Sequence, residues 1–331
     1  MNLFAKIIIF STLLVISAIS KADFVEGVTA YKNGEFEEAI SIFKQLAEKD
    51  DNRAQFALGL MYDNGDGVAS DKVEALKWYQ AGAKNGNSKA QYNLAVLYQT
   101  GEGTEEDKKK AARWFGKAAQ SGNRDAVSRL HALANKGLPI AQFHIGNLYR
   151  TGKILKKNLK NAFTWTKKAA DANIIPAQYN LAHSYATGTG VAKNANLAKS
   201  LYEKAARAGN PKAQYNYGLL LLNENLASGN IDAAINWLNK AADQNNVSAQ
   251  ITLAKIYDEG EIVKGNQSIA VKWYLRAATA GNIEAQNYAG YLYATGSGVE
   301  KDPQKALSWF SKAAKQGSSE AIKNKKVLAD S

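Results

Sequence analysis

Three histidines, His131, His144 and His183, are the residues of this sequence best suited to catalysis or metal binding. A metal site needs several ligands close together, and the usual signatures place two histidines one helical turn apart or a histidine beside carboxylates. No His-Glu-x-x-His motif is present, and no aspartate or glutamate stands at such spacing from the three histidines. We therefore predict neither a metal site nor a cofactor.

Cysteine is absent from the 331 residues, which excludes disulfides, thiolate catalysis, zinc fingers and iron–sulfur clusters. The sequence has no phosphate loop and no Gly-x-Gly-x-x-Gly motif. A recurring Gly-x-Gly-Val follows a predicted helix rather than a strand, so it indicates a turn and not a nucleotide site. A Ser-x-x-Lys motif at a plausible nucleophile position is also lacking. These absences predict that the protein is not an enzyme.

A repeat of 36 residues organises the chain. The dipeptide Ala-Gln recurs with spacings of 36, 51, 36, 36, 36 and 36 residues, and its alanines are Ala54, Ala90, Ala141, Ala177, Ala213, Ala249 and Ala285. When each of these alanines is counted as position 1, position 25 accounts for all 6 tryptophans, and position 22 is always alanine. A fixed period of this length is typical of solenoids made of stacked helix pairs.

Each repeat has the pattern of two helices. Apolar residues at positions 1, 5, 8 and 9 form one face of a first helix, and those at 22, 25, 26 and 29 form one face of a second. Glycines such as Gly65 and Gly67 suit the exit from the first helix because glycine readily adopts a positive φ. Small alanines at positions 1 and 22 allow the helices to approach closely. The tryptophans then fill the space between hairpins, so we predict that they belong to the core.

The motif Ala-x-x-x-Leu-Gly/Ala-x-x-Tyr-x-x-Gly-x-Gly-Val, followed by Ala-x-x-Trp-Tyr/Phe-x-x-Ala-Ala-x-x-Gly, is almost complete at Gln55–Gly86 and Gln286–Gly317. Over residues 54–321 the chain resembles the Sel1-like repeat proteins, relatives of the tetratricopeptide repeats. The resemblance implies an all-α fold, a right-handed α-solenoid superhelix of antiparallel helix pairs. It also implies a protein that mediates protein assembly. Exported bacterial members of the family often act in signalling, envelope processes or host interaction.

These patterns predict the domain organisation. A signal peptide occupies residues 1–22, and a helix pair similar to a tetratricopeptide repeat caps the solenoid at 23–53. Sel1-like repeats fill residues 54–320, and the 15 extra residues of the long interval form a truncated unit at 126–140. That unit is expected to be one helix, retained either by neutral drift or as a functional hinge. A polar capping helix ends the chain at 321–331.

The first 22 residues have the layout of a secretory signal peptide. Lys6 provides the positive charge, and Ile7–Ile19 is an apolar run. Ser20 and Ala22 are small residues at the −3 and −1 positions of a cut before Asp23. We therefore expect an exported protein, periplasmic or secreted, with no transmembrane segment in the mature chain. An uncleaved membrane anchor is the alternative.

The formal net charge is +12, and about +10 remains when Lys6 and Lys21 are removed with the signal peptide. Such an excess favours anionic partners. Lysines cluster at Lys108–Lys110 and again at Lys153, Lys156, Lys157, Lys160, Lys167 and Lys168. An envelope-binding protein that recognises an anionic glycan or lipid surface through these clusters is the alternative function, and a merely solvated face is the simpler explanation. Nucleic acid is not expected as a partner, because the tryptophans are assigned to the core.

A solenoid presents a concave face built from its first helices. Positions 3, 4, 7, 10 and 11 lie on the side of each first helix that faces away from the core positions. Gln-Tyr-Asn occurs there three times, beginning at Gln91, Gln178 and Gln214. Asparagine amides can pair with a peptide backbone, and tyrosines provide rigid contact area. The candidate partner-binding residues are Tyr92, Asn93, His144, Asn147, Arg150, Tyr179, Asn180, His183, Tyr215 and Asn216.

The sequence thus predicts an exported scaffold or adaptor. Its partner, bound on this concave face, is a protein or a cell-wall-associated enzyme. The competing explanation is that tyrosine and asparagine at these positions are consensus packing residues of the related repeats. A remote third class is a weak β-lactam hydrolase, because a few Sel1-like proteins have been credited with such chemistry. This chain lacks the cysteines typical of that branch. The sequence does not identify the partner.

Overall fold

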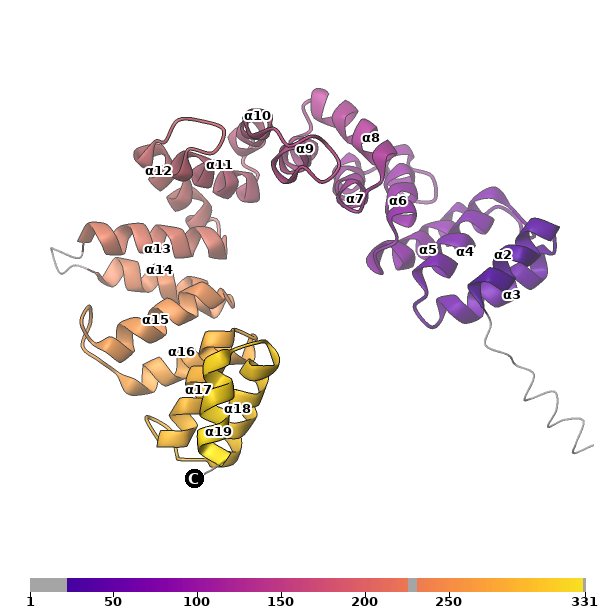
Figure 1. The fold of residues 1–331 in the computed structure, drawn as a ribbon. Helices are drawn as coiled ribbons and strands as arrows, with labels where there is room; N and C mark the ends of the chain where they lie inside the picture. The colour runs from indigo at the N-terminus through magenta and orange to yellow at the C-terminus, as the bar shows by residue number, and fades with distance from the viewer. Residues whose placement is uncertain (1–22, 226–230, 330–331) are drawn as a thin grey trace, which may run out of the picture. The chain divides into compact units, whose positions relative to one another are not determined.

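The computed structural model describes residues 23–225 and 231–329, and its regular elements are helices (Figure 1). These two ranges contain 18 helices and no strand, which confirms the predicted all-α solenoid class. The predicted signal peptide lies outside the described residues. The helices are α2 (Phe24–Asn33), α3 (Phe36–Ala47), α4 (Asn52–Asn64), α5 (Lys72–Lys84), α6 (Ser88–Thr100), α7 (Lys108–Gln120), α8 (Arg124–Asn135), α9 (Pro139–Thr151), α10 (Leu159–Asp171), α11 (Ile175–Thr187), α12 (Ala195–Arg207), α13 (Pro211–Asn225), α14 (Asp232–Asp243), α15 (Val247–Glu259), α16 (Gln267–Thr279), α17 (Ile283–Thr295), α18 (Pro303–Lys315) and α19 (Ser319–Ala329).

Capping side chains and glycines set the ends of the first helices. Before α4, the Asp51 carboxylate accepts hydrogen bonds from two backbone N–H groups of the first turn, and Gly65 follows the last turn with a φ of 85°. Asn87 and Gly101 do the same for α6. A capping oxygen satisfies N–H groups that have no helical partner, and glycine adopts the left-handed conformation without strain. The polar residues and glycines between the apolar positions therefore determine where these helices begin and end.

One first helix departs from this plan because no glycine stands at its expected end. Glu224 occupies that position, and α13 extends over 15 residues, whereas α11 and α15 each have 13. Glutamate is a good helix former and provides no exit, so the helix continues past the usual boundary.

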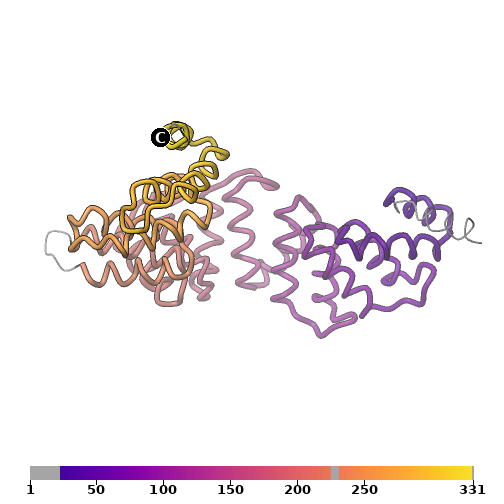
Figure 2. The backbone as a smooth tube through the Cα atoms, turned by 90° about the horizontal axis from the view of Figure 1, so that it is seen from below, coloured from indigo at the N-terminus to yellow at the C-terminus, as the bar shows by residue number. Residues whose placement is uncertain are grey.

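The chain forms two compact units, Met1–Ala172 and Asn173–Ser331. In the first unit the helices from α2 to α10 pack against their neighbours in chain order, and in the second unit the helices from α11 to α19 do the same. Figure 2 shows this succession of helical hairpins as a tube. Because each helix contacts mainly its chain neighbours, each repeat buries its apolar faces against the adjacent repeats.

A single helix, α8, follows the pair α6–α7. It contacts both α7 and α9, and α7 also contacts α9 directly. Gly116 of α7 permits this close approach, because a Cβ atom there would lie 2.4 Å from the imidazole ring of His144 on α9. The first unit therefore contains a cluster of three mutually contacting helices, α7, α8 and α9.

Alanine is buried at both predicted helix-contact positions. The seven position-1 alanines are 0% exposed, and the position-22 alanines are at most 5% exposed. The prediction for the tryptophans is right only in part, because Trp273 is buried at 3% exposure and the other five are half-buried. In four of these five, the lysine three residues later lies over the ring, at 4.0 Å from the ring centre in the Trp309–Lys312 pair. The rings thus pack at the edges of the core, where a cation stabilises the ring face.

The glutamine that follows each position-1 alanine has a structural role that the sequence analysis did not assign. Gln250 is 1% exposed, and its Nε2 donates a hydrogen bond to the carbonyl oxygen of Ala242 at 3.0 Å. The same contact, to the carbonyl eight residues earlier, is made by Gln55, Gln91, Gln142, Gln214 and Gln286. Carbonyl groups in the last turn of a helix lack helical partners. The glutamine therefore helps to close the preceding second helix.

Candidate partner-binding surface

The residues predicted to bind a partner lie on the first helices of both units. We call positions 3, 4, 7, 10 and 11 of these helices the first-helix face. In the first unit, α6 carries Tyr92 and Asn93, and α9 carries His144, Asn147 and Arg150. In the second unit, α11 carries Tyr179, Asn180 and His183, and α13 carries Tyr215 and Asn216. Arg150 and His183 are exposed, and the other eight are half-buried.

The position-3 aromatic side chains pack against the second helix of their own repeat. The ring centres of Tyr92 and Phe115 are 5.5 Å apart, and those of Tyr179 and Tyr202 are 5.9 Å apart. Such tilted aromatic pairs stabilise packing beyond the area that they bury. These tyrosines therefore contribute one side to the repeat core and leave only part of the ring accessible on the first-helix face.

Two of the position-4 asparagines connect consecutive repeats. The Asn93 side chain forms a hydrogen bond with the hydroxyl of Tyr79, which lies on α5 of the preceding repeat. The Tyr79 hydroxyl in turn donates to Oδ2 of Asp63 at 3.0 Å. Asn216 forms the equivalent hydrogen bond with Tyr202, and burial raises the pKa of Tyr202 to about 12. Burial raises the pKa of both phenols and keeps them neutral, whereas the asparagine hydrogen bonds act in the opposite direction. The role of these hydrogen bonds is to tie neighbouring repeats together.

The other two asparagines of the prediction are also engaged inside the protein. Oδ1 of Asn147 accepts a hydrogen bond from Nη2 of Arg150 at 3.3 Å. Asn180 likewise takes part in intramolecular contacts. The pattern of tyrosine and asparagine thus serves packing between repeats, and binding of a partner by these amides stays a prediction.

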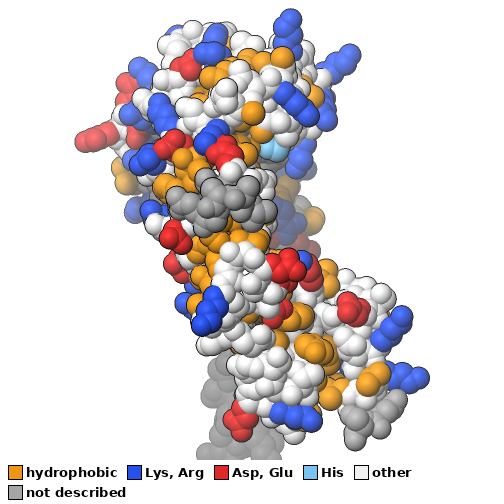
Figure 3. Space-filling model, turned by 90° about the vertical axis from the view of Figure 1, so that its left-hand side faces the viewer, with side chains coloured by type: hydrophobic (Ala, Val, Ile, Leu, Met, Phe, Trp, Pro, Cys, Tyr) orange, Lys and Arg blue, Asp and Glu red, His pale blue; other side chains and the backbone are white. Residues whose placement is uncertain are grey.

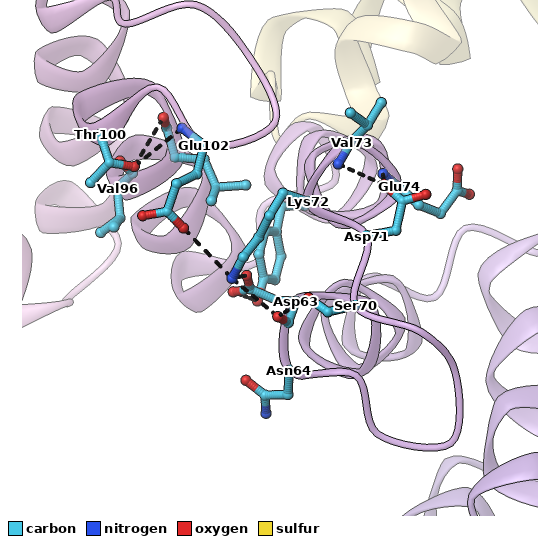
Figure 4. A network of polar contacts seen from close by, with 12 residues as sticks. Asp63, Asn64, Ser70, Asp71, Lys72, Val73, Glu74, Val96, Thr100 and Glu102 are labelled. Atoms are coloured by element: carbon cyan, nitrogen blue, oxygen red, sulfur yellow. Dashed lines mark hydrogen bonds and ion pairs between the residues drawn. The ribbon is translucent and has the colours of Figure 1, made fainter.

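Asp63 lies in a polar network with Lys72 and Glu102 (Figure 4). Nζ of Lys72 lies 2.5 Å from Oδ1 of Asp63 and 3.6 Å from Oε2 of Glu102, which follows α6. The hydrogen bond with Asp63 raises the pKa of the Lys72 ammonium above its ordinary value. Because the lysine is partly exposed, this pair adds little to stability by itself. Its effect is to orient Asp63 toward the buried Tyr79 hydroxyl.

His144 is held against α7 rather than presented to a partner. Its pKa is lowered to about 4, chiefly by burial and also by the charges of Arg113 and Lys117. The imidazole is therefore neutral at physiological pH, and its Nδ1 atom is buried with no hydrogen-bond partner in the described residues. The ring fits over Gly116, as described above, so the histidine acts in the packing of α7 and α9.

No metal centre is formed by the described side chains. Within residues 23–225 and 231–329, no group of three or more histidine, aspartate or glutamate residues could hold a metal ion. The same part of the chain contains no helix with the length and apolar character needed to cross a bilayer.

An apolar cavity on the first-helix face was missed by the sequence analysis. It has a volume of about 180 Å³ and lies where the N-terminal helices α2 and α3 meet α4. The lining side chains are all apolar or aromatic, namely Phe24, Val28, Tyr31, Phe43, Phe56, Ala57, Leu60 and Met61. The Tyr31 hydroxyl is directed to Oδ2 of Asp66 at 2.8 Å. Three of the lining residues occupy positions 3, 4 and 7 of the first repeat, so extending the helical-wheel argument to α4 would have found them.

A second set of residues that the sequence analysis missed lies at the far end of the second unit. On α17, Tyr288 and Tyr291 occupy positions 4 and 7, and Tyr291 is 49% exposed. The Tyr288 hydroxyl donates to Oδ2 of Asp258 at 2.5 Å, and its ring centre is 4.1 Å from that of Tyr274. Burial raises the pKa of Tyr288 above its ordinary value. The accessible ring of Tyr291 thus lies on the same helix as Tyr288, whose hydroxyl is hydrogen-bonded.

Comparison with known proteins identifies the repeat. A family profile described as Sel1 repeat matches seven segments of 36 residues, at 52–87, 88–123, 139–174, 175–210, 211–246, 247–282 and 283–318. The matched segments cover more than half of the chain. The residues left out between the second and third segments include all of α8.

Solved structures and curated proteins give further similarities. A Sel1 repeat protein from Oxalobacter formigenes is 31% identical, with a TM-score of 0.57, over 93% of this chain and 88% of that chain. A protective antigen of uropathogenic Escherichia coli strains is 27% identical, with a TM-score of 0.47, over 93% and 79% of the two chains. An exopolysaccharide production negative regulator of Rhizobium leguminosarum bv. viciae is 47% identical over 53 residues, which are 16% of this chain and 20% of that protein. The chain thus spans about a fifth of the length of the curated relatives that it matches.

Proposed function

The chain belongs to the Sel1 repeat family, and from that premise we propose that it is an adaptor that holds an extended segment of a protein partner on its first-helix face. Sel1 repeat proteins are generally scaffolds for protein interactions, and their fold is a non-enzymatic scaffold type. The proposal adds the place where the partner is anchored. That place is the apolar cavity between α2, α3 and α4.

The cavity is the observation that carries this proposal. Its 180 Å³ suits one large apolar side chain, and its lining offers that side chain no competing polar group. Burying an aromatic side chain removes roughly 150–250 Å² from water, which favours binding by about 4–6 kcal/mol before ordering costs. A single anchor of this kind is typical of interfaces in which a few residues supply most of the binding energy.

A half-buried tyrosine of α6 supports the same proposal. Tyr92 lies at position 3 of the next first helix along the first unit, one repeat after Phe56 of the cavity. Its ring packs against the ring of Phe115 on the second helix of the same repeat. Rigid aromatic side chains of this kind give contact area at low entropic cost. A peptide anchored in the cavity would therefore find further contact area on α6.

The test fills the cavity without disturbing its walls. Purified protein, residues 23–331, is used to select linear peptides from a random library, and their affinities are measured by fluorescence anisotropy. Ala57→Phe places a ring inside the cavity, and Ala57→Ser is the matched control that leaves the space open. We expect the selected peptides to share one large apolar residue and to lose at least about tenfold in affinity for A57F only. Peptides that bind A57F as tightly as the unchanged protein would remove the basis of the proposal.

The proposal also includes export of the protein from the cytoplasm. Its support is the apolar segment Ile7–Ile19 together with the capping of α2. The Asp23 side chain accepts a hydrogen bond from the N–H of Val25 at 3.1 Å, and Glu26 accepts one from the N–H of Asp23 at 3.3 Å. A cut before Asp23 would preserve these contacts and give Glu26 a charged amino group as its partner. Mass spectrometry of the protein recovered from the periplasm or medium should give a chain that begins at Asp23; a chain retained in the cytoplasm at full length would contradict export.

A further inference from the structure

The positive charge of the protein is concentrated in one stretch of the first unit. The segment from Lys108 to Lys168 contains 15 lysines and arginines and a single acidic residue, Asp125. The whole chain has 42 basic and 30 acidic residues, so 27 basic and 29 acidic residues remain outside this segment. The formal charge of +12 therefore arises from this stretch, and the rest of the chain is close to neutral. We call the 15 side chains the cationic surface.

The charges of the cationic surface are accessible. All 15 side chains belong to exposed residues. Three of them form ion pairs, at 2.7 to 3.7 Å, with acidic residues close by in the chain. The other twelve have no ion pair with any side chain in the described part of the protein. Exposed cations in such number repel one another, so an anionic partner would relieve a cost that is present in the free protein.

The helices that carry these charges, α7, α8, α9 and α10, pack together. Each of these helices contacts the next, and α7 also contacts α9, all within the first unit. Lys110, Arg113 and Lys117 recur at helical spacing along the exposed side of α7. Lys153 and Lys160 continue the charge through the loop after α9 and into α10. The single helix α8 contributes Arg124 and Arg129 in the middle of the set.

The chemistry of the cationic surface disfavours nucleic acid and lipid bilayers. The rings of Trp114 and Trp165, which could stack on bases, are covered by Lys117 and Lys168 at 4.3 and 4.5 Å. None of the large hydrophobic side chains exposed in the described ranges lies between Lys108 and Lys168, so nothing in the segment would insert into acyl chains. The face drawn in Figure 3 carries basic, acidic and hydrophobic side chains side by side.

Lysine, a flexible point charge, accounts for 11 of the 15 residues, and arginine for 4. The flexible stem of lysine lets its charge reach anions at varied positions, whereas the rigid fork of arginine is preferred where one planar group must be held in two places. We propose that the cationic surface binds an acidic polysaccharide, a linear polymer with carboxylates at regular intervals. A flexible polyanion can follow charges that are spread over four helices, which an acidic protein patch of fixed shape cannot. This proposal does not depend on the peptide site.

The test compares two variants with equal loss of charge. In the first, Lys153, Lys156, Lys157 and Lys160 are replaced together by glutamine. Binding of a fluorescent polyuronate of about 20 sugars to residues 23–331 is followed by anisotropy at low and high salt. Four exposed contacts at a few tenths of a kcal/mol each predict a loss of about tenfold in affinity at low salt. The dependence of affinity on salt should also become shallower, because fewer contacts are screened.

The control replaces four exposed lysines outside the segment, Lys84, Lys193, Lys212 and Lys264, by glutamine. It should bind the polyuronate within about twofold of the unchanged protein, because the two variants differ only in where charge is lost. Equal losses in both variants would show that net charge alone drives binding and would overturn the proposal. So would an absence of binding at low salt, or tighter binding to a single-stranded oligonucleotide or to anionic vesicles of matched charge. Thermal melts of both variants verify that folding is unchanged.

Discussion

Substitution of Gly116 by alanine tests the reason for the close contact between α7 and α9. A Cβ atom at this position would lie 2.4 Å from Cγ and Nδ1 of His144 and 2.7 Å from Cδ2. These atoms belong to the rigid part of the ring, so the helices or the histidine must move. Such overpacking costs about 1–3 kcal/mol, whereas alanine gains about 1 kcal/mol over glycine in a helix interior. We therefore expect Gly116→Ala to change the stability of the first unit by about 0 to −2 kcal/mol.

The background of His144→Ala separates the two contributions. With the imidazole removed, the new methyl group meets no ring, and Gly116→Ala should then stabilise the protein by up to about 1 kcal/mol. The double-mutant cycle, measured by denaturant unfolding followed with far-UV circular dichroism, should therefore give a coupling of about 1–3 kcal/mol between the two positions. If Gly116→Ala had the same effect in both backgrounds, the ring would not be the obstacle, and the account of the α7–α9 contact would be wrong.

Two further predictions concern buried polar groups. Because the pKa of His144 is about 4 in the folded protein and 6.5 when unfolded, the unfolded state binds more protons between these values. The free energy of unfolding should therefore fall as the pH is lowered from about 6.5 toward 4, by up to about 1.4 kcal/mol per pH unit. His144→Gln should flatten this dependence in urea titrations at several pH values. Tyr79→Phe removes the hydroxyl between Asp63 and Asn93 and should destabilise the protein by about 1–2 kcal/mol in the same assay, and an unchanged midpoint would mean that the buried hydroxyl contributes nothing.

The repeat architecture was predictable because its causes are local and recur. Alanine at positions 1 and 22 forces close helix contacts wherever it occurs, and all seven copies of each are buried in the structure. Asparagine or aspartate before a helix and glycine after it fix the boundaries within a few residues. The period of 36 residues therefore gave the helix pairs and the family, which the profile match confirms.

The tryptophans were assigned to the core by the same reasoning, and all six pack against it, but five of the six are only half-buried. A ring at position 25 is regular in sequence, but its burial depends on how far the neighbouring hairpins cover the outer edge of the second helix. Trp273 is buried, whereas Trp309 is half-buried and the side chain of Lys312 lies over its ring. Cations do not decide this burial, because Lys272 and Arg276 also lie over the ring of the buried Trp273.

The candidate site shows the same limit more sharply. Asn93 and Asn216 were selected as donors for a partner, but each has a tyrosine hydroxyl of the preceding repeat within hydrogen-bond reach. No spacing within one repeat reveals that contact, because it depends on how two repeats stack. The apolar cavity was missed for a related reason, since its walls come from α2, α3 and α4 together.

By itself, the sequence determined what is written in short-range patterns: the helices, their ends, the period, the family and the amount of charge. Only the tertiary structure decided which of the outward residues are free. Packing of neighbouring helices engages Asn93, Asn216 and His144 and opens a cavity beside Phe56. It also brings the four helices that carry the cationic surface into contact with one another. The physical reason is that the availability of a side chain depends on residues that packing brings close, and these belong to a neighbouring helix or repeat.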